Sequence, residues 1–528
     1  MDDGNLQRNL ISRVNVGDTL TRAAWRDPGK LALVEGDRRL TYGEFNELVN
    51  RFANALLARG YRRGDALGLA CANSIEFLVT YYACAKTGVV CVPVNLGWQA
   101  PEIGYVLGHS RARGVVAQTH FLPLITKAAD GLPAAGDIIA APGAAPAPDG
   151  AVLFGDVCAA APAAEPEVYI ADRDPLSYLY TSGTTSAPKG VVSSHLAVYL
   201  ESLTGPVTLG IHAGDRCAVM MPLFHTAQLN GIASATIYMG GTLYLLAGFD
   251  PVALLSLIER ERITQIFGLP VMYRALLDHP ALPQHDLSSL RLALYAMAPM
   301  PDTDLRRAIE AFGCDFALGF GQTEMNPLTT VFRPEHQLTH PGSVGTQVPN
   351  VQVAIMGEDG SLLPPGSSGE IVYRGPHVME GYLRNDEATD EAFDGGWFHS
   401  GDMGHFDEDG LLWFEDRKKD VIKTGGENVA SIEVEKALYE AEPRIAEVVA
   451  VGLPHERWVE AITVIVVPKP GSGLTAEDVA AAARSRLAGF KRPKRVVLVD
   501  DMPRTSTGKV QKNVLRQTYQ DLYRDEHA

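Results

Sequence analysis

The sequence predicts an α/β protein: a large N-terminal domain of α/β subdomains with a small β-subdomain, followed by a small mobile α+β C-terminal domain. Over the first third of the chain, short apolar segments alternate with amphipathic helical patterns, which is typical of a largely parallel sheet covered by helices. Near residue 345 the pattern changes to short strands between Asp-Gly and Pro-Pro-Gly turns. The expected domains are residues 1–416, with the β-subdomain at about 345–416, and residues 417–528.

The α/β region begins with three short apolar strands and two helices between them. Thr41 opens the first helix, because Glu44 three residues later completes a capping-box pattern. Asn73 is the expected N-cap of the second helix, and Gly88 ends that helix. The expected strands are residues 31–34, 66–71 and 89–94.

Two later segments have unusual compositions. Residues 133–167 are rich in Ala, Pro and Gly, which predicts a surface excursion with little chemical content. Residues 217–249 contain no Asp, Glu, Lys or Arg, yet Pro222, His225 and the pair Gly240-Gly241 interrupt the run. The pattern therefore favours buried strand, loop and helix over a transmembrane segment.

The C-terminal region is expected to be a compact α+β unit behind a charged run at residues 415–420. Such a run is typical of a solvated turn, and its position between two sequence patterns indicates a hinge. In the β-subdomain the expected strands are residues 351–355, 370–373 and 411–414. Beyond the run we expect helices at 431–441 and 475–486 and strands at 445–451, 461–467 and 495–499.

The 528-residue chain is acidic, because 46 Lys and Arg residues face 63 Asp and Glu residues, and 46 − 63 gives −17. A nucleic-acid clamp needs a basic face, so we expect no nucleic-acid partner, whereas a basic pocket for a small anion stays open. The six cysteines lie mostly in apolar runs without a CxxC pair and are expected to be buried thiols. The N-terminus is polar and unlike a signal peptide, which together with the thiols predicts a cytoplasmic protein.

The strongest chemical signal is the segment 180–192, YTSGTTSAPKGVV, before an expected helix near Ser193. Its hydroxyls, its backbone N–H groups and the positive charge of Lys189 together suit a polyphosphate. A P-loop is excluded, because Lys189 precedes Gly190 and no Ser or Thr follows the lysine. A plain surface linker rarely combines these features between apolar flanks.

This segment resembles the TSGTTGxPKG signature of the adenylate-forming (ANL) superfamily, with Ser186 at a position that is usually glycine. The superfamily contains acyl-CoA synthetases, aryl-CoA ligases, luciferases and the adenylation domains of peptide synthetases. The resemblance extends over about residues 18–516 through several ordered motifs. It implies that the loop binds the ATP phosphates through Thr181, Ser182, Gly183, Thr184, Thr185 and Lys189.

Residues 319–324, GFGQTE, resemble the YGxTE motif of the superfamily. The resemblance makes Thr323 a phosphate contact and Glu324 a Mg²⁺ ligand, and a hard cation does favour carboxylate and phosphate oxygens. It also makes the three residues before Gln322 nucleotide contacts, namely Gly319, Phe320 and Gly321.

Residues 295–301 resemble the GGAPL segment that lies against the adenine, with Ala298 and Pro299 at matching positions. Ala296 and Met297 replace glycines that border the acyl tunnel in the superfamily. The resemblance therefore implies that Met297 narrows this tunnel.

The segments 396–402, 417–428 and 503–512 resemble the remaining motifs. By this resemblance Asp402 accepts hydrogen bonds from the ribose, Arg417 contacts the nucleotide and Lys419 is the hinge position. Lys509 is the catalytic lysine that bridges the α-phosphate and the attacking carboxylate. The glycines of the pantetheine tunnel, where side chains would not fit, are Gly425 and Gly426.

Residues 221–225, MPLFH, resemble the PLFH motif, which places His225 beside the acid-binding pocket. Amino-acid-activating relatives have an Asp here, and no carboxylate lies near His225 in the sequence, which argues against an amino-acid substrate. We expect Asn230 and Met297 to line the pocket as well. The lining windows, residues 224–231, 297, 317–320 and 325–328, contain no Arg, which favours a hydrophobic acid over a dicarboxylate.

The sequence therefore predicts an AMP-forming acyl-CoA synthetase that uses ATP, Mg²⁺ and CoA. A carboxylic acid forms an acyl-adenylate, the small domain rotates about Lys419, and the CoA thiol then takes the acyl group. Two alternatives stay open: an adenylase that loads a carrier-protein phosphopantetheine, and a non-catalytic nucleotide-binding homologue. The joint presence of Lys189, Glu324, Asp402 and Lys509 argues against the second alternative. A homodimer is possible, and the sequence does not identify the acid.

Overall fold

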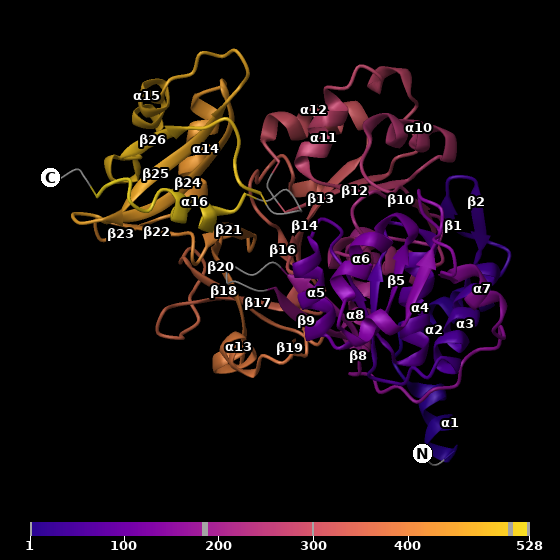
Figure 1. Ribbon diagram of the computed structural model, residues 1–528. Coiled ribbons are helices and arrows are strands. Elements are labelled where there is room, and N and C mark those ends of the chain that lie inside the picture. The colour runs from indigo at the N-terminus through magenta and orange to yellow at the C-terminus, as the bar shows by residue number, and fades with distance from the viewer. Residues whose placement is uncertain (1–2, 182–187, 298–299, 505–509, 525–528) are drawn as a thin grey trace. The chain divides into compact units, whose positions relative to one another are not determined.

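The computed structural model describes residues 3–181, 188–297, 300–504 and 510–524. Two compact units make up the chain, and each combines two segments: Met1–Val353 with Tyr373–Phe398, and Ala354–Val372 with His399–Ala528 (Figure 1). The second unit thus takes in part of the expected β-subdomain together with the C-terminal region. A domain boundary at about residue 417 stays a prediction.

Two large sheets form the framework of the first unit. Within the described ranges, one sheet has nine strands in the order β16-β15-β14-β13-β12-β10-β11-β1-β2, and the other has eight in the order β19-β9-β8-β4-β3-β5-β6-β7. The strands of the nine-stranded sheet are β1 (Leu31–Glu35), β2 (Arg38–Thr41), β10 (Arg216–Val219), β11 (Thr242–Leu245), β12 (Gln265–Gly268), β13 (Leu292–Ala296), β14 (Asp315–Gly321), β15 (Leu328–Phe332) and β16 (Thr346–Gln347). Those of the eight-stranded sheet are β3 (Ala66–Ala70), β4 (Val90–Pro93), β5 (Ala112–Gln118), β6 (Ile138–Ala141), β7 (Val152–Leu153), β8 (Pro175–Thr181), β9 (Lys189–Ser194) and β19 (Gly381–Tyr382). The pairs β3–β4, β3–β5, β12–β13 and β13–β14 are parallel, as the alternation of strands and helices predicts.

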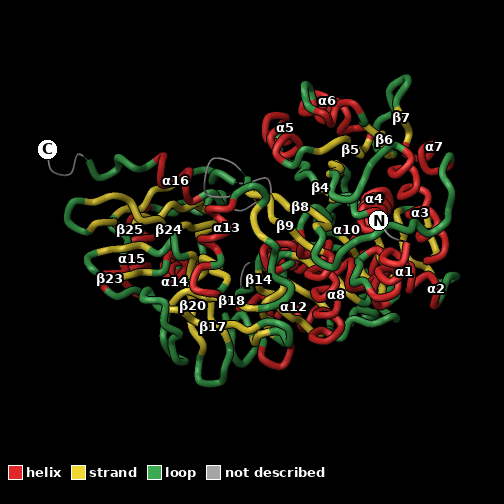
Figure 2. Tube along the Cα trace, turned by 90° about the horizontal axis from the view of Figure 1, so that it is seen from below, coloured by secondary structure: helices red, strands yellow, loops and turns green. Residues whose placement is uncertain are grey.

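Helices pack around both sheets of the first unit (Figure 2). They are α1 (Asp3–Ser12), α2 (Gly17–Arg26), α3 (Tyr42–Ala58), α4 (Ile75–Thr87), α5 (Ala100–His109), α6 (Leu122–Ala129), α7 (Phe154–Ala159), α8 (His195–Leu209), a π-helix (Ala227–Ser234), α9 (Ala235–Met239), α10 (Pro251–Glu261), α11 (Pro270–Leu277), α12 (Asp302–Phe312) and α13 (Asp386–Ala392). The largest apolar core joins α2, α3 and α4 with β1, β10 and β11 of one sheet and β3 of the other. In β3, Leu67 and Leu69 face this core, whereas Ala66 and Ala70 face a second core with α5 and α6. This division follows from the alternation of side chains along a strand.

The local capping signals are confirmed at one helix and wrong at the next. Thr41 and Glu44 form the predicted capping box at the start of α3. Ser74, not Asn73, caps α4, because its hydroxyl accepts the hydrogen bond of Phe77 N (3.3 Å). Asn73 instead joins two segments: its Nδ2 donates to Met221 O (2.9 Å), and its Oδ1 accepts from Leu223 N (2.8 Å).

The expectation of a plain surface excursion at residues 133–167 is wrong in part. β6 extends the eight-stranded sheet beside β5, and Phe154 and Cys158 of α7 are buried. Near the end of this segment the Glu165 carboxylate accepts a hydrogen bond from the fully buried Lys86 Nζ (2.6 Å). Composition concealed these roles, since Ala and Ile are apolar enough to form a buried strand even in a Pro- and Gly-rich context.

The second unit holds most of a four-stranded sheet and an α+β body with a five-stranded sheet, as far as its residues are described. The strands of the smaller sheet are β17 (Gln352–Met356), β18 (Gly369–Arg374), β20 (Phe398–Phe406) and β21 (Leu412–Arg417). The α+β body contains β22 (Ile422–Thr424), β23 (Glu427–Val429), α14 (Ser431–Ala441), β24 (Ile445–His455), β25 (Val459–Pro468), α15 (Ala476–Arg486), β26 (Arg495–Leu498) and α16 (Lys512–Thr518). The predicted strands and helices of this region are all present with small shifts of their ends.

The structure also tests two expectations from composition, that the cysteines are buried thiols and that the uncharged segment 217–249 does not span a membrane. All six cysteines are free thiols; five are buried and Cys314 is half-buried, which agrees with the sequence prediction. Within the residues that the structure describes, every helix is too short or too polar to cross a lipid bilayer.

Candidate active site

The predicted phosphate loop connects the two strands of a hairpin. β8 and β9 pair antiparallel, with Thr181 opposite Lys189. Of the other loop residues, Ser182, Gly183, Thr184 and Thr185 lie outside the described residues. A second strand therefore follows the loop, and the expected helix begins only at His195, where Ser194 Oγ accepts the hydrogen bond of Ala197 N (3.3 Å).

Tyr382 joins Lys189 to Glu324, and no sequence motif pointed to this tyrosine. β19 pairs antiparallel with β9 and sets Tyr382 opposite Val191. The Lys189 ammonium lies 4.7 Å from the centroid of the Tyr382 ring, a cation–π contact. The Tyr382 hydroxyl donates a hydrogen bond to Glu324 Oε1 (3.0 Å). Burial, and then the nearby Glu324 carboxylate, raise the pKa of Tyr382, so the hydroxyl keeps the proton that it donates.

Glu324 is held in a 3₁₀ turn, Thr323–Met325, directly after β14. Met379 N donates to its backbone carbonyl (2.7 Å), which fixes the turn beside β19. The chain turns sharply here, since a Cβ at Gly321 would lie 1.9 Å from Pro327 O, so only glycine fits. Thr323 and Glu324 are both half-buried in this turn.

The Glu324 carboxylate fits a Mg²⁺ site of the nucleotide-dependent kind. Glu324 Oε1 accepts the hydrogen bond of the Tyr382 hydroxyl, and among the described residues Glu324 Oε2 has no hydrogen-bond partner. Mg²⁺ bound with a nucleotide takes one or two protein carboxylates, with phosphate and water oxygens as its other ligands. Within the described ranges there is no cluster of three His, Cys, Asp or Glu residues that would hold a metal without a phosphate.

Met297 follows the end of β13 in a left-handed backbone conformation, with φ = 71°. β13 and β14 are parallel and set Ala296 opposite Gly319, so the adenine segment and the Glu324 motif leave the sheet at the same edge. The Met297 side chain is 54% exposed. A left-handed conformation at a non-glycine residue costs about 1–2 kcal/mol, which explains why glycine is the superfamily residue at this position. Ala298 and Pro299 lie outside the described residues.

His225 and Asn230 lie at and within the π-helix region, in different environments. The His225 ring is half-buried and packs against Phe224, with 4.5 Å between ring centroids. Asn230 is fully buried: its Oδ1 accepts from the Tyr81 hydroxyl (2.9 Å), and its Nδ2 donates to Thr226 Oγ1 (3.1 Å). Its amide is thus engaged within the protein, and its role in the pocket stays a prediction.

In the second unit, Asp402 and Arg417 face each other across the strands β20 and β21. Arg417 Nε lies 2.8 Å from Asp402 Oδ1. The Asp402 side chain is almost fully buried, and the Arg417 side chain is partly exposed. The two residues predicted to contact the ribose and the nucleotide are therefore neighbours.

Gly425 and Gly426 form the two-residue turn of the β22–β23 hairpin. Both have positive φ, 62° and 88°, as the favoured two-residue hairpin turn requires. A Cβ at Gly425 would also lie 3.0 Å from the Trp458 ring. On that ring, Arg457 and Lys494 make cation–π contacts at 4.7 and 4.8 Å from the centroid. The turn therefore adjoins an aromatic ring with two positive charges.

The charged run at residues 415–420 covers the last three residues of β21 and the tight turn that follows it. Asp420 N and Val421 N both donate to Arg417 O, at 2.7 and 3.1 Å. The Lys419 side chain is exposed. The buried Asp416 carboxylate accepts the hydrogen bond of Ser431 N and so caps α14, whose own N-cap residue, Ala430, has no side chain that can do so.

Lys509 lies outside the described residues, but the base of its loop is well anchored. Arg504 and Val510 form an antiparallel bridge, and Gln511 N donates to Pro503 O (2.8 Å). Lys512 lies 2.8 Å from Glu435 Oε1 in an ion pair. The described residues on both sides of Lys509 therefore belong to the same body as α14.

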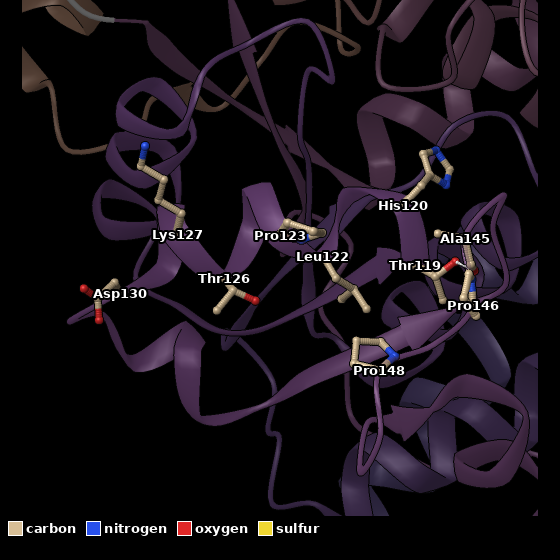
Figure 3. Close-up of a pocket in the computed structure, with 10 residues that line it drawn as sticks. All are labelled: Thr119, His120, Leu122, Pro123, Thr126, Lys127, Asp130, Ala145, Pro146 and Pro148. Atoms are coloured by element: carbon tan, nitrogen blue, oxygen red, sulfur yellow. Dashed lines mark hydrogen bonds between the residues drawn. The ribbon is translucent and has the colours of Figure 1, made fainter.

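A separate cavity of about 780 Å³ lies away from these residues (Figure 3). Its lining comes from α6, from the turn before α6 and from the segment 145–148. Thr119 Oγ1 donates to Ala145 O (2.6 Å) across one end. None of the sequence-predicted site residues lines it, and its lining combines apolar side chains with polar and charged ones.

Comparison with known proteins identifies relatives along the whole chain. A family model described as AMP-binding enzyme matches residues 20–383, and one described as AMP-binding enzyme C-terminal domain matches residues 433–509. A feruloyl-CoA synthase of an Amycolatopsis species is 36% identical over 508 residues, which cover 96% of this chain and 99% of the relative. An indoleacetate–CoA ligase of Aromatoleum aromaticum is 34% identical, with 96% and 98% covered. The crystal structure of ATP-bound MatB from Rhodopseudomonas palustris superposes with a TM-score of 0.87 at 32% identity, covering 96% of this chain and all of that one.

The Tyr382 contacts predict a measurable role in ATP-dependent pyrophosphate release. Tyr382→Phe keeps the ring beneath Lys189 but removes the hydrogen bond to Glu324, and such a bond to a charged group is worth about 1.5–3 kcal/mol. We expect kcat/KM for pyrophosphate release to fall about 10-fold or more. Tyr61→Phe is the matched control, because the Tyr61 hydroxyl also donates to a carboxylate, Asp137 Oδ2 (2.9 Å), elsewhere in the unit. Equal kinetics of both variants would show that the Glu324 contact does not matter.

The Met297 side chain predicts a limit on substrate size. Met297→Gly should extend activity toward longer or bulkier acids, because changing an apolar pocket by about one methylene alters discrimination by about 1–3 kcal/mol. Met297→Ala is the control: it shortens the side chain but keeps a non-glycine residue at positive φ. The measurement is kcat/KM over acids of graded size. An unchanged size profile in both variants would mean that Met297 points away from the acid.

Proposed function

The chain belongs to the AMP-binding enzyme family and is an AMP-forming acid–thiol ligase, and we propose that it converts a carboxylic acid with an apolar body to its CoA thioester. The observation that carries the proposal is the link from Lys189 through Tyr382 to Glu324 at the base of the phosphate loop. It combines a cation for phosphate oxygens with a carboxylate oriented for a metal.

In the first half-reaction, a carboxylate oxygen of the acid attacks the α-phosphorus of ATP. The bond from this phosphorus to the bridging oxygen of pyrophosphate breaks, and the acyl-adenylate forms. Lys189 and the hairpin loop hold the phosphates, and Lys509 stabilises the charge that develops between carboxylate and α-phosphate. Mg²⁺, held by Glu324, would neutralise phosphate charge. Asp402 and Arg417 orient the ribose and the nucleotide.

In the second half-reaction, the thiol of CoA attacks the acyl carbon, loses its proton and expels AMP. The Gly425-Gly426 turn leaves room for the narrow pantetheine arm, because neither residue has a side chain. Trp458 with Arg457 and Lys494 supports CoA as the acceptor, since an aromatic ring between cations suits an adenine with phosphates. Between the two steps, a rotation about Lys419 would remove Lys509 from the reaction site and bring the surface around Gly425, Gly426 and Trp458 to it.

The direct test is a panel of carboxylic acids with ATP, Mg²⁺ and CoA, read out as pyrophosphate, AMP and thioester. Acids with apolar bodies should react, and free amino acids should not, because the sequence around His225 has no acidic residue to pair with their α-ammonium group. A holo carrier protein offered in competition with CoA tests the alternative acceptor. Adenylation of free amino acids alone, or transfer to the carrier alone, would contradict the proposal.

Lys509→Ala should separate the two half-reactions. It removes a charge that is needed only while the adenylate forms, so we expect acid-dependent pyrophosphate release to fall by about two orders of magnitude or more. Conversion of pre-formed acyl-adenylate and CoA to thioester should be largely preserved. Lys436→Ala, at an exposed lysine of α14, is the charge control. Equal losses in both half-reactions of Lys509→Ala would overturn the exchange of lysine loop and glycine turn.

A further inference from the structure

Glu201 of α8 is a fully buried carboxyl group that the established chemistry does not use. Neither carboxyl oxygen makes a hydrogen bond of good geometry among the described residues, although Leu328 N–H and the Thr204 hydroxyl are close enough to lower the pKa of Glu201 against the larger effect of burial. A buried carboxyl group without a well-formed hydrogen bond destabilises the folded protein, so its presence in α8 calls for an explanation.

The Glu201 carboxyl lies where two of the windows predicted to line the acid pocket meet. A Cβ at Gly231 of the π-helix would lie 3.7 Å from Glu201 Oε1 and 3.4 Å from Pro327 Cδ. Gly231 belongs to the window 224–231, and Pro327 to the window 325–328. The windows contain no carboxylate side chain, and Glu324 only borders one of them, so the sequence concealed the acidic group of Glu201.

Within the described part of the chain, the basic group paired with Glu201 is His377, and it is neutral. His377 Nδ1 is 3.9 Å from Glu201 Oε2, but this nitrogen accepts a hydrogen bond from Asn350 Nδ2 (2.7 Å). Burial lowers the pKa of His377 to about 4, so the ring is neutral at pH 7. Burial also raises the pKa of Glu201 well above its usual range, which leaves a neutral carboxyl group that can donate one hydrogen bond and accept others.

A second unsatisfied polar group lies on the same π-helix. Gln228 is fully buried, and neither its Oε1 nor its Nε2 has a hydrogen-bond partner within the described residues. Asn230, two residues further on, shows the contrast, because Tyr81 and Thr226 satisfy its amide. The predicted acid pocket is therefore bordered by unsatisfied polar groups and is not purely apolar.

We propose that the acid substrate carries a hydroxyl group at the end that reaches Gly231 and Pro327, and that this hydroxyl hydrogen-bonds to the Glu201 carboxyl group. A hydroxyl donates and accepts at once, which matches a neutral carboxyl group better than an ammonium or a second carboxylate does. Glu201 is in this sense a specificity-determining residue. The inference rests on the proposed acid-activating function.

The test compares each of several aryl and aliphatic acids with its hydroxyl-free analogue in the full-length protein. Wild type should favour the hydroxylated acid about 10- to 100-fold in kcat/KM for pyrophosphate release, because a site built for a hydroxyl is left unpaired by the analogue. Glu201→Leu should bring this ratio close to one, and Glu201→Gln should retain part of it, since an amide also donates and accepts. The melting temperature should not fall in Glu201→Leu, because an unpaired polar group is replaced by an apolar one.

Gln265→Leu is the matched control. Gln265 is also fully buried with both amide atoms unpartnered among the described residues, but it lies in β12 opposite Leu292, at the far end of β13 from Met297. Its substitution should leave the hydroxyl preference unchanged.

Three results would overturn the inference. The ratio could stay the same in wild type and Glu201→Leu; both acids could lose activity equally with a lower melting temperature, which indicates a structural role; or amino analogues could be preferred over hydroxylated acids. A wild type that releases no pyrophosphate with any acid would refute the proposed function instead, so the two failures are distinguishable.

Discussion

The antiparallel pairing of β9 with β19 is the constraint on which the candidate site depends. β9 begins at Lys189, and β19 consists of Gly381 and Tyr382 alone, nearly 200 residues later in the chain. The pairing is completed by hydrogen bonds from Glu380 N to Val192 O (2.9 Å) and from Leu383 N to Gly190 O (2.8 Å). A slip of one residue would turn Tyr382 to the other face of the sheet. The register therefore decides whether a lysine from one segment and a carboxylate from another share one aromatic side chain.

What the sequence predicted well is what depends on neighbours in the chain. The capping box of Thr41 and Glu44 is such a local pattern, and so is the glycine pair Gly425-Gly426, which forms a hairpin turn. The nucleotide motifs could also be named, because a resemblance to a family assigns an expected role to each residue that matches a motif position. The sheet order and the presence of a second strand after the phosphate loop could not, since strand pairing is set by contacts between distant segments.

The residues that the sequence did not reveal have long-range partners. From the sequence, Tyr382 is an ordinary aromatic strand residue. Its role becomes visible only in the fold, which places β9 and Glu324 beside it. Asn73 has the right type for a helix cap, but the carbonyl of Met221 and the N–H of Leu223 compete successfully for its amide. Glu201 lies in an apolar helix, and the sequence does not show whether its carboxyl group faces solvent or the protein interior. In each case a side chain of ambiguous local meaning acquires its role from the tertiary fold.

The capping contact of Asp416 has a consequence for how the protein divides its time between conformations. Asp416 precedes Lys419, and the helix that it caps begins at Ser431, beyond it. A chain that turns at Lys419 must give up this contact or carry it along. An N-cap contributes about 0.5–2 kcal/mol, which corresponds to a roughly 2- to 30-fold bias in a two-state population. One buried carboxylate, next in the chain to Arg417, would thus bias the ratio of the two conformations that the proposed turn at Lys419 requires, and with it the fraction of molecules ready for each half-reaction.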